Sequence, residues 1–187
     1  WGESPFFCLL DHRTLELTGK RMVIVGSGTL GSAVADLAKA FGMQVVFAAR
    51  PGNEANDSRP ALHDLVHEAD VLSLHCPLTD ATRHLVDASL MSRLKPGALL
   101  INCARGGVID ELAALAALRE GRLGGLGVDV LPEEPPRAGH PLIEALHEPL
   151  NLIVTPHAAW ISPEARNNVV LLTVDNIVAW KSDFHVG

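Results

Sequence analysis

Six short runs of mostly apolar residues, rich in Val, Ile and Leu, are the feature that most limits how this chain can fold. They are residues 22–25, 45–48, 71–74, 98–101, 126–130 and 152–154. The runs do not alternate polar with apolar residues, as strands with one exposed face do, so we expect them to be buried on both faces. Longer segments with helical spacing lie between them. This order predicts an α/β domain, a Rossmann-type, doubly wound parallel sheet of about six strands with helices on both faces.

The length agrees with a single domain. A chain of 187 residues corresponds to about one domain, and no interior linker divides it. We divide it into an N-terminal arm (residues 1–20), a Rossmann core (21–160) and a C-terminal helix (161–187). Because the chain opens on Trp1, we interpret it as a piece cut from a longer protein.

The composition argues against several classes of protein. The chain has 15 Lys and Arg against 22 Asp and Glu, and it carries no basic stripe, so we expect no nucleic-acid partner. No apolar run approaches the ~20 residues that span a bilayer, and no signal peptide is recognisable. The three cysteines, Cys8, Cys76 and Cys103, are widely spaced and suit a reducing compartment. We therefore expect a cytoplasmic protein without a membrane partner.

A glycine-rich turn joins the first apolar run to a segment with helical spacing. The turn is Gly26-Ser27-Gly28-Thr29-Leu30-Gly31. Gly26 permits the tight turn, Gly28 lets a pyrophosphate approach the backbone, and Gly31 lets the helix pack close to the strand. The free N–H groups at the start of the helix then favour phosphate. We expect all of these turn residues except Ser27 to contact a dinucleotide, with a simple connecting turn as the alternative.

The helix after this turn carries an apolar stripe that includes Leu30, Leu37 and Phe41.

The residue at the end of the second apolar run distinguishes sites for NAD from sites for NADP. An NAD site places an acid there to bind the ribose hydroxyls, whereas this chain has Ala49 followed by Arg50. We predict a preference for NADP(H), with Arg50 as the main determinant and Arg59 as a second candidate. The alternative, in which Arg50 is an ordinary surface charge and the cofactor is NAD, stays open.

Four further blocks follow the third to the sixth run. They are His75-Cys76-Pro77-Leu78-Thr79, Asn102-Cys103-Ala104-Arg105-Gly106-Gly107, Asp129-Val130-Leu131-Pro132-Glu133-Glu134-Pro135 and Thr155-Pro156-His157-Ala158-Ala159-Trp160. With the glycine turn, and over essentially the whole chain, they resemble the D-isomer-specific 2-hydroxyacid dehydrogenases, most closely the hydroxypyruvate reductase/glycerate dehydrogenase group. The resemblance implies an oxidoreductase that transfers a hydride between a nicotinamide cofactor and a small 2-keto or D-2-hydroxy acid, such as hydroxypyruvate, glyoxylate or glycerate.

These blocks bring chemically distinct side chains to the carboxyl edge of the predicted sheet, where open parallel sheets bind ligands. A guanidinium matches a substrate carboxylate, and a histidine can protonate a carbonyl oxygen near neutral pH. The resemblance assigns these roles to Arg105 and His157, and it assigns Glu134 to orienting His157. Glu133 is the rival, but the acid of the family pattern directly precedes Pro. Taken singly, each of these residues could equally be structural.

The resemblance implies further contacts and partners. Asp129 matches the residue that contacts the nicotinamide carboxamide. The other expected cofactor contacts are Cys76, Pro77, Thr82, Cys103, Ala104, His157 and Ala159. The family also forms dimers through an N-terminal arm, so we expect a homodimer. Its substrate domain is absent from this chain, so residues 1–187 alone are expected to bind NADP(H) but to turn over little.

Two other functions are alternatives. The same fold and the same Arg, Glu and His set occur in proteins that resemble the C-terminal-binding transcriptional corepressors, which sense dinucleotides without turnover. The missing acid at Ala49 disfavours them. His63 and His67 superficially resemble a zinc-protease helix, but Asp64 stands where the general-base Glu should be, and no third ligand follows. We expect no metal.

Overall fold

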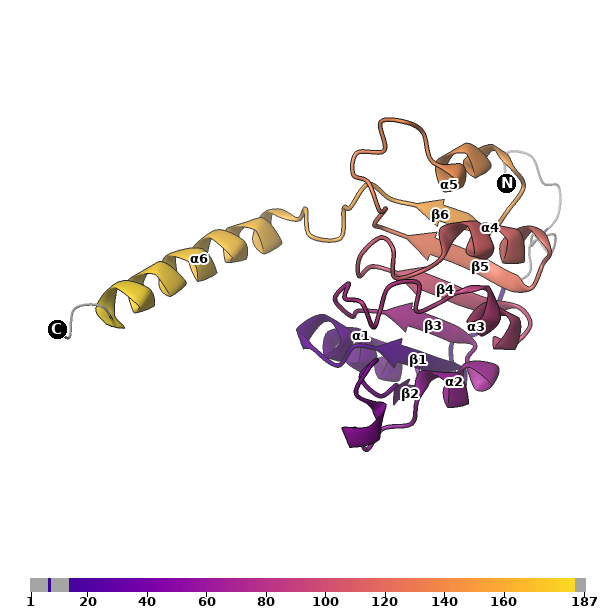
Figure 1. The fold of residues 1–187 in the computed structure, drawn as a ribbon, viewed down its shortest axis with the longest axis horizontal. Helices are drawn as coiled ribbons and strands as arrows, with labels where there is room; N and C mark the ends of the chain where they lie inside the picture. The colour runs from indigo at the N-terminus through magenta and orange to yellow at the C-terminus, as the bar shows by residue number, and fades with distance from the viewer. Residues whose placement is uncertain (1–6, 8–13, 184–187) are drawn as a thin grey trace.

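The computed structural model describes residues 7 and 14–183, and a single parallel sheet lies at its centre (Figure 1). The strands are β1 (Arg21–Val25), β2 (Gln44–Phe47), β3 (Val71–Leu74), β4 (Ala98–Asn102), β5 (Leu123–Val128) and β6 (Leu152–Val154). Their order is β2-β1-β3-β4-β5-β6, and every neighbouring pair is parallel. The predicted fold class is confirmed, although β5 begins three residues before the predicted run.

Helices and short turns connect the strands. The helices are α1 (Thr29–Ala40), α2 (Leu62–Leu65), α3 (Ala88–Arg93), α4 (Glu111–Arg119), α5 (Pro141–Glu144) and α6 (Pro163–Asp183). Three 3-10 turns are η1 (Glu54–Asn56), η2 (Val66–Glu68) and η3 (Ala145–His147). Helix α4 begins after Asp110, whose carboxylate accepts the Ala113 N–H at 3.0 Å. Such a cap satisfies an N–H group that would otherwise lack a partner in the first turn.

Alternate residues of the strands pack on opposite faces of the sheet. On one face, α2 to α5 cover a large core that includes Leu72, Leu74 and Leu100, all fully buried. On the other face, α1 covers a smaller cluster that includes Ala38 and Val71. Helices therefore lie on both faces, but α1 covers its face incompletely, since Ile153 of β6 is 62% exposed there. The carboxyl ends of all six strands lie at one edge, where the loops described below gather.

The side of helix α1 that packs against the sheet is not the side that carries its large apolar residues. Its buried residues are small, namely Gly31, Ala35 and Ala38. Leu30 and Leu37 are exposed, as is Phe41 just after the helix. The cause is the close approach of helix and strand, since a Cβ at Gly31 would collide with the Gly26 carbonyl oxygen. Larger side chains do not fit between α1 and β1.

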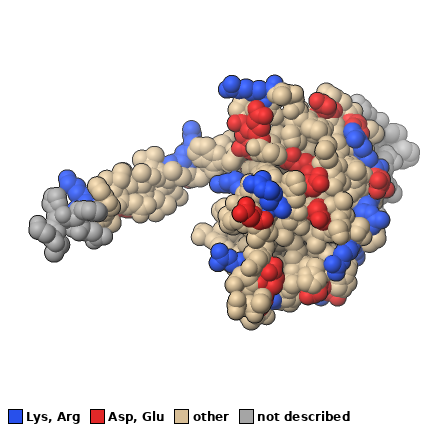
Figure 2. Space-filling view, in the orientation of Figure 1, with Lys and Arg blue, Asp and Glu red and all other residues tan. Residues whose placement is uncertain are grey.

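Helix α6 leaves the sheet and extends away from it (Figure 1). The face of the sheet domain seen in Figure 2 carries acidic and basic side chains intermixed. The apolar side chains of α6, such as Leu172 and Ile177, are exposed and contribute nothing to the core. Most of the predicted N-terminal arm and residues 184–187 lie outside the described residues. Within the described part of the chain, no helix has the length and hydropathy needed to cross a membrane.

Candidate active site

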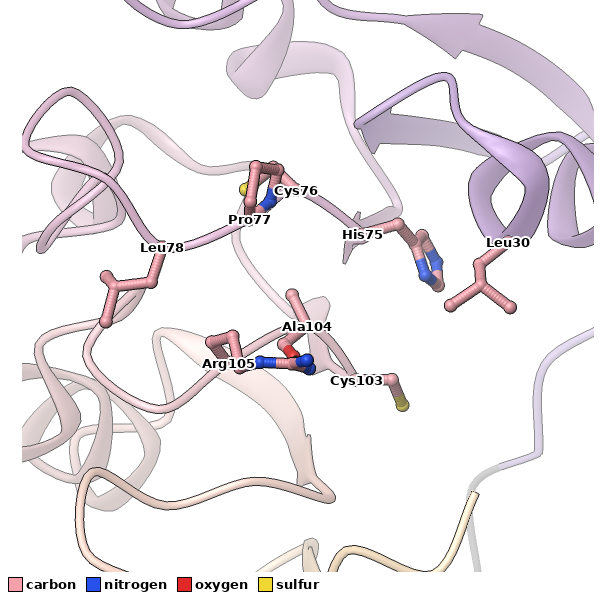
Figure 3. Close-up of a pocket in the computed structure, with 8 residues that line it drawn as sticks. All are labelled: Leu30, His75, Cys76, Pro77, Leu78, Cys103, Ala104 and Arg105. Carbon is pink, nitrogen blue, oxygen red and sulfur yellow. The ribbon is translucent and has the colours of Figure 1, made fainter. Parts of the chain in front are cut away.

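A cavity of about 370 Å³ lies at the carboxyl edge of the sheet (Figure 3). It is lined by Leu30, His75, Cys76, Pro77, Leu78, Cys103, Ala104 and Arg105. These residues follow β1, β3 and β4. Strands β2 and β3 lie on opposite sides of β1, so the strand order reverses at β1. Open α/β sheets bind nucleotides where the strand order reverses in this way. Five predicted cofactor contacts line this cavity: Leu30, Cys76, Pro77, Cys103 and Ala104.

The glycine loop beside this cavity has the shape that a bound pyrophosphate requires. Gly26 has a φ of 103°, and a Cβ there would lie 2.5 Å from the His75 carbonyl oxygen. At Gly28 a Cβ would meet nothing within 4 Å, so the space above the loop is open. No side chain caps the N–H groups at the start of α1. Open space beside uncapped N–H groups suits a phosphate, so the loop fits a dinucleotide.

The two predicted NADP determinants differ in their contacts. The Arg50 side chain is exposed and makes no hydrogen bond or ion pair with residues 7 and 14–183. Its backbone N–H donates to Asp57 Oδ2 at 2.8 Å. Arg59 instead reaches the glycine loop, where its Nη1 donates to Ser27 Oγ at 2.7 Å. Sequence reasoning did not identify Asp57, because spacing in a polar loop does not tell which side chains meet.

His157 and Glu134 form an acid–base pair across two loops. His157 Nδ1 lies 2.7 Å from Glu134 Oε2, and the Leu131 N–H donates to Glu134 Oε1 at 2.8 Å. Burial alone would raise the pKa of Glu134, but the hydrogen bonds from His157 and Leu131 and the charge of Arg105 lower it. The contact at Nδ1 orients the ring and leaves Nε2 to face a substrate. Glu133 and Glu134 are both exposed, and it is Glu134 that contacts His157.

Asp129 holds the backbone turn that carries His157. The His157 N–H donates to the Asp129 carbonyl oxygen at 2.8 Å, and the residue adopts a φ of 51°. The Asp129 carboxylate accepts the Thr155 hydroxyl (2.5 Å) and the N–H groups of Ala158 (2.7 Å) and Ala159 (3.1 Å). Since non-glycine residues rarely adopt this backbone conformation, these bonds stabilise the turn. Asp129 is thus a positioning residue here, and its contact with a carboxamide stays a prediction.

A second cavity, of about 190 Å³, adjoins the acid–base pair. It is lined by Asp129, Leu131, Glu134, Pro135, Pro136, Thr155, Pro156 and His157. Arg105 lines the first cavity, where its Nη1 donates to the Ala104 carbonyl oxygen at 2.7 Å. The charge of Arg105 also lowers the pKa of Glu134. The three predicted catalytic side chains therefore come from three loops to one edge of the sheet.

Two residues around the first cavity differ from expectation in their position. Thr82 does not line the cavity; its buried hydroxyl donates to the Pro77 carbonyl oxygen at 2.7 Å and accepts the Thr79 N–H at 2.7 Å. It shapes the turn that carries Pro77. His75, which was not among the expected contacts, faces Leu30 in the cavity (Figure 3). Burial lowers the pKa of His75, and its place directly after β3 was the signal that could have identified it.

The two histidines that resemble a zinc-protease motif lie on different elements. His63 is in α2 and His67 is in the 3-10 turn η2, and both are exposed. His63 Nε2 lies 3.0 Å from the carboxylate of its neighbour Asp64. Among residues 7 and 14–183, no group of three or more His, Cys, Asp or Glu side chains could hold a metal ion.

The fold and the site define a dinucleotide-binding α/β domain with a histidine–carboxylate pair at the carboxyl edge of its sheet. A family model described as "D-isomer specific 2-hydroxyacid dehydrogenase, NAD binding domain" matches residues 9–159. The chain belongs to this family.

Individual relatives agree with this family. The chain is 40% identical over 181 residues to a glycerate dehydrogenase of Methylorubrum extorquens, covering 96% of the chain and 56% of the relative. It is 39% identical over 171 residues to a glyoxylate reductase of Aeropyrum pernix, covering 89% and 50%. A solved acyclic imino acid reductase in complex with NADPH and D-Arg superimposes with a TM-score of 0.81 at 30% identity, covering 97% and 57%. The chain thus spans about half the length of these relatives.

Proposed function

We propose that the protein containing this chain is a dehydrogenase that interconverts a small 2-keto acid and its D-2-hydroxy acid. The observation that carries the proposal is the pair of His157 and Glu134, held at the same carboxyl edge of the sheet as the glycine loop. The glycerate dehydrogenase and glyoxylate reductase relatives support hydroxypyruvate, glyoxylate or glycerate as the substrate.

Each catalytic side chain then has one task. The nicotinamide supplies or accepts the hydride when the cofactor is bound. His157 holds, at Nε2, the proton that the carbonyl oxygen receives during reduction. Glu134 keeps the imidazole ring oriented through Nδ1. Arg105 binds the substrate carboxylate with its planar guanidinium.

We further infer that the cofactor is NADP(H) rather than NAD(H). Ala49, just beyond the end of β2, is buried and offers no carboxylate to the ribose hydroxyls, while Arg50 and Arg59 lie in the loop that follows. The related reductase in complex with NADPH supports this preference. NAD is the alternative, since the family model is described as an NAD-binding domain.

The remaining expectations belong to the same proposal. They are a homodimer, a cytoplasmic location, the division of the chain at residues 20 and 160, and little turnover by residues 1–187 alone. They rest on the resemblance and on the composition.

The test is to mix the complete protein with NADPH and either hydroxypyruvate or glyoxylate and to follow the loss of reduced cofactor by its absorbance. We expect oxidation of NADPH that depends on the keto acid. His157→Ala should lower kcat by about 100-fold or more, the usual contribution of a general acid, while NADPH binding is retained. The absence of oxidation with every short 2-keto acid would refute the proposal.

A dinucleotide sensor of the corepressor type is the second candidate. The dehydrogenase and reductase names of the relatives do not favour it. A sensor would bind a partner peptide in a nucleotide-dependent manner and show no turnover, so the same assay separates the two.

A further inference from the structure

The loop between β2 and α2 contains a cluster of polar contacts that the chemistry at His157 does not use. Arg59 Nε donates to Asp57 Oδ1 at 2.8 Å, and Arg59 Nη2 donates to Asp57 Oδ2 at 2.6 Å. The third nitrogen, Nη1, donates to the Ser27 hydroxyl oxygen at 2.7 Å. A bidentate pair therefore holds the Arg59 guanidinium against the glycine loop.

The carboxylate of Asp57 is fully occupied. In addition to the two side-chain bonds from Arg59, it accepts the backbone N–H groups of Arg59 (3.0 Å) and Arg50 (2.8 Å). Four donors on two oxygens use the acceptor capacity of a carboxylate. The Arg59 side chain and these N–H groups hold the pKa of Asp57 well below its usual range. An acid thus lies beside the loop after β2, but its oxygens are not available to the hydroxyls of an NAD ribose.

The position of Ser27 shows which part of a cofactor Arg59 would meet. Ser27 is exposed in the turn before Gly28, above which the space is open. In sheets of this kind, the pyrophosphate lies on the glycine loop and the adenosine ribose lies at the end of the second strand. Arg59 lies in the loop after β2 and donates a hydrogen bond to Ser27 in the glycine loop, so its side chain lies between the two places.

We propose that Arg59, positioned by Asp57 and assisted by the Ser27 hydroxyl, is the residue that binds the 2′-phosphate of NADP(H). This inference rests on the proposed function and names the group that selects the cofactor. A guanidinium binds phosphate through charge-assisted hydrogen bonds. Since two bonds to Asp57 already fix the Arg59 side chain, it loses less conformational entropy on binding. Arg50, without a side-chain partner among the described residues, lacks this preorganisation and is the weaker determinant.

The test is equilibrium binding of two ligands that differ only by the 2′-phosphate, namely 2′,5′-ADP and 5′-AMP. Isothermal titration calorimetry on the complete protein requires no keto acid and no turnover. We expect wild type to prefer 2′,5′-ADP. Arg59→Gln should weaken 2′,5′-ADP binding by about 10-fold or more, the loss of hydrogen bonds to a charged group, with little effect on 5′-AMP. Retained 5′-AMP binding also shows that the variant is folded.

Two further variants complete the design. Arg50→Gln should weaken 2′,5′-ADP binding less than Arg59→Gln does. Arg93→Gln is the matched control, because Arg93 also donates to a neighbouring segment, at the His63 carbonyl oxygen, but lies away from the glycine loop. It should leave both ligands unchanged.

Three results would overturn the inference: equal binding of the two ligands by wild type, an equal loss of both ligands in Arg59→Gln, or a larger loss in Arg50→Gln. Selective binding of 2′,5′-ADP through Arg59 would support the inference even if no 2-keto acid were reduced. Failure of the inference is therefore distinguishable from failure of the dehydrogenase proposal.

Discussion

Glu134 contacts His157 with one carboxylate oxygen and the Leu131 N–H with the other, so the imidazole ring is oriented by a group that is itself fixed. The contact joins the loop after β5 to the loop after β6. The ring therefore keeps its direction without a substrate present, which is the preorganisation that general acid catalysis requires.

Replacing Glu134 with Gln should lower kcat for keto acid reduction. The amide can keep one hydrogen bond to His157, but a neutral hydrogen bond is weaker than one to a carboxylate, so the ring is held less firmly. We expect kcat to fall about 10-fold, while the dissociation constant of NADPH stays close to that of wild type. Steady-state kinetics measure the change, with Glu133→Gln as the control because Glu134, and not Glu133, contacts His157. A kcat equal to that of wild type would contradict the assigned role.

Arg105→Lys should separate charge from geometry in substrate binding. Lysine retains the positive charge but cannot form two parallel hydrogen bonds to a carboxylate, so KM for the keto acid should rise about 10-fold. The dissociation constant of NADPH, measured by fluorescence titration, should stay close to that of wild type. Arg122→Lys is the control, because Arg122 lies at the opposite edge of the sheet, just before β5. An unchanged KM in Arg105→Lys would exclude the bidentate contact.

Two glycines of the same loop should respond differently to substitution by alanine. At Gly31 a Cβ would collide with the Gly26 carbonyl oxygen, so Gly31→Ala should lower the free energy of unfolding by about 1–3 kcal/mol. At Gly28 nothing lies within 4 Å, so Gly28→Ala should keep the melting temperature of wild type. The added methyl group would instead occupy the space for the pyrophosphate and weaken NADPH binding. Thermal unfolding and calorimetric titration check both parts, and a destabilised Gly28→Ala would contradict them.

Asp70 should make stability depend on pH. Its carboxylate accepts the Arg21 N–H at 2.8 Å and the Lys95 ammonium at 2.6 Å. Burial alone would raise the pKa of Asp70, but these two bonds lower it. The contribution of Asp70 to the stability of the folded state is therefore present above its unfolded-state pKa of about 3.9. This contribution is lost as the pH falls through the lower pKa that Asp70 has in the folded state.

Asp70→Asn should accordingly lower the free energy of unfolding by about 1 kcal/mol at neutral pH. The difference from wild type should shrink at pH values below about 3. Urea unfolding at the two pH values measures it. Asp36→Asn, which removes only an exposed 3.4 Å pair with Lys39, is expected to change little at either pH. A difference for Asp70→Asn that does not vary with pH would contradict the ion-pair account.

Most of the sheet could be predicted because strands buried on both faces leave a strong apolar signal. The exception is the start of β5, where Gly124 and Gly125 carry no such signal. A Cβ at Gly124 would collide with the Gly97 backbone, so close packing against a neighbouring loop explains the glycine there. In α1 the periodic apolar residues predicted the helix, but packing against Gly26 decided which face is buried.

The blocks at the strand ends indicated Arg105, Glu134 and His157, because parallel strands bring their carboxyl ends to one edge. The contact of Arg59 with Ser27 could not be predicted in the same way. The two residues are 32 positions apart, and Arg59 lies in an irregular loop whose side-chain directions follow no period. Tertiary structure alone decides that Arg59, and not Arg50 nearer the end of β2, meets the glycine loop.

The position of β6 gives the two halves of the site unequal local stability. This strand has three residues, lies at the margin of the sheet and pairs only with β5, and His157 follows it directly. The cavity near the glycine loop is instead built on β1, β3 and β4, which have neighbours on both sides. Fraying of a marginal strand costs less free energy than opening the centre. On warming, proton transfer should therefore fail through local unfolding while the domain still holds its nucleotide.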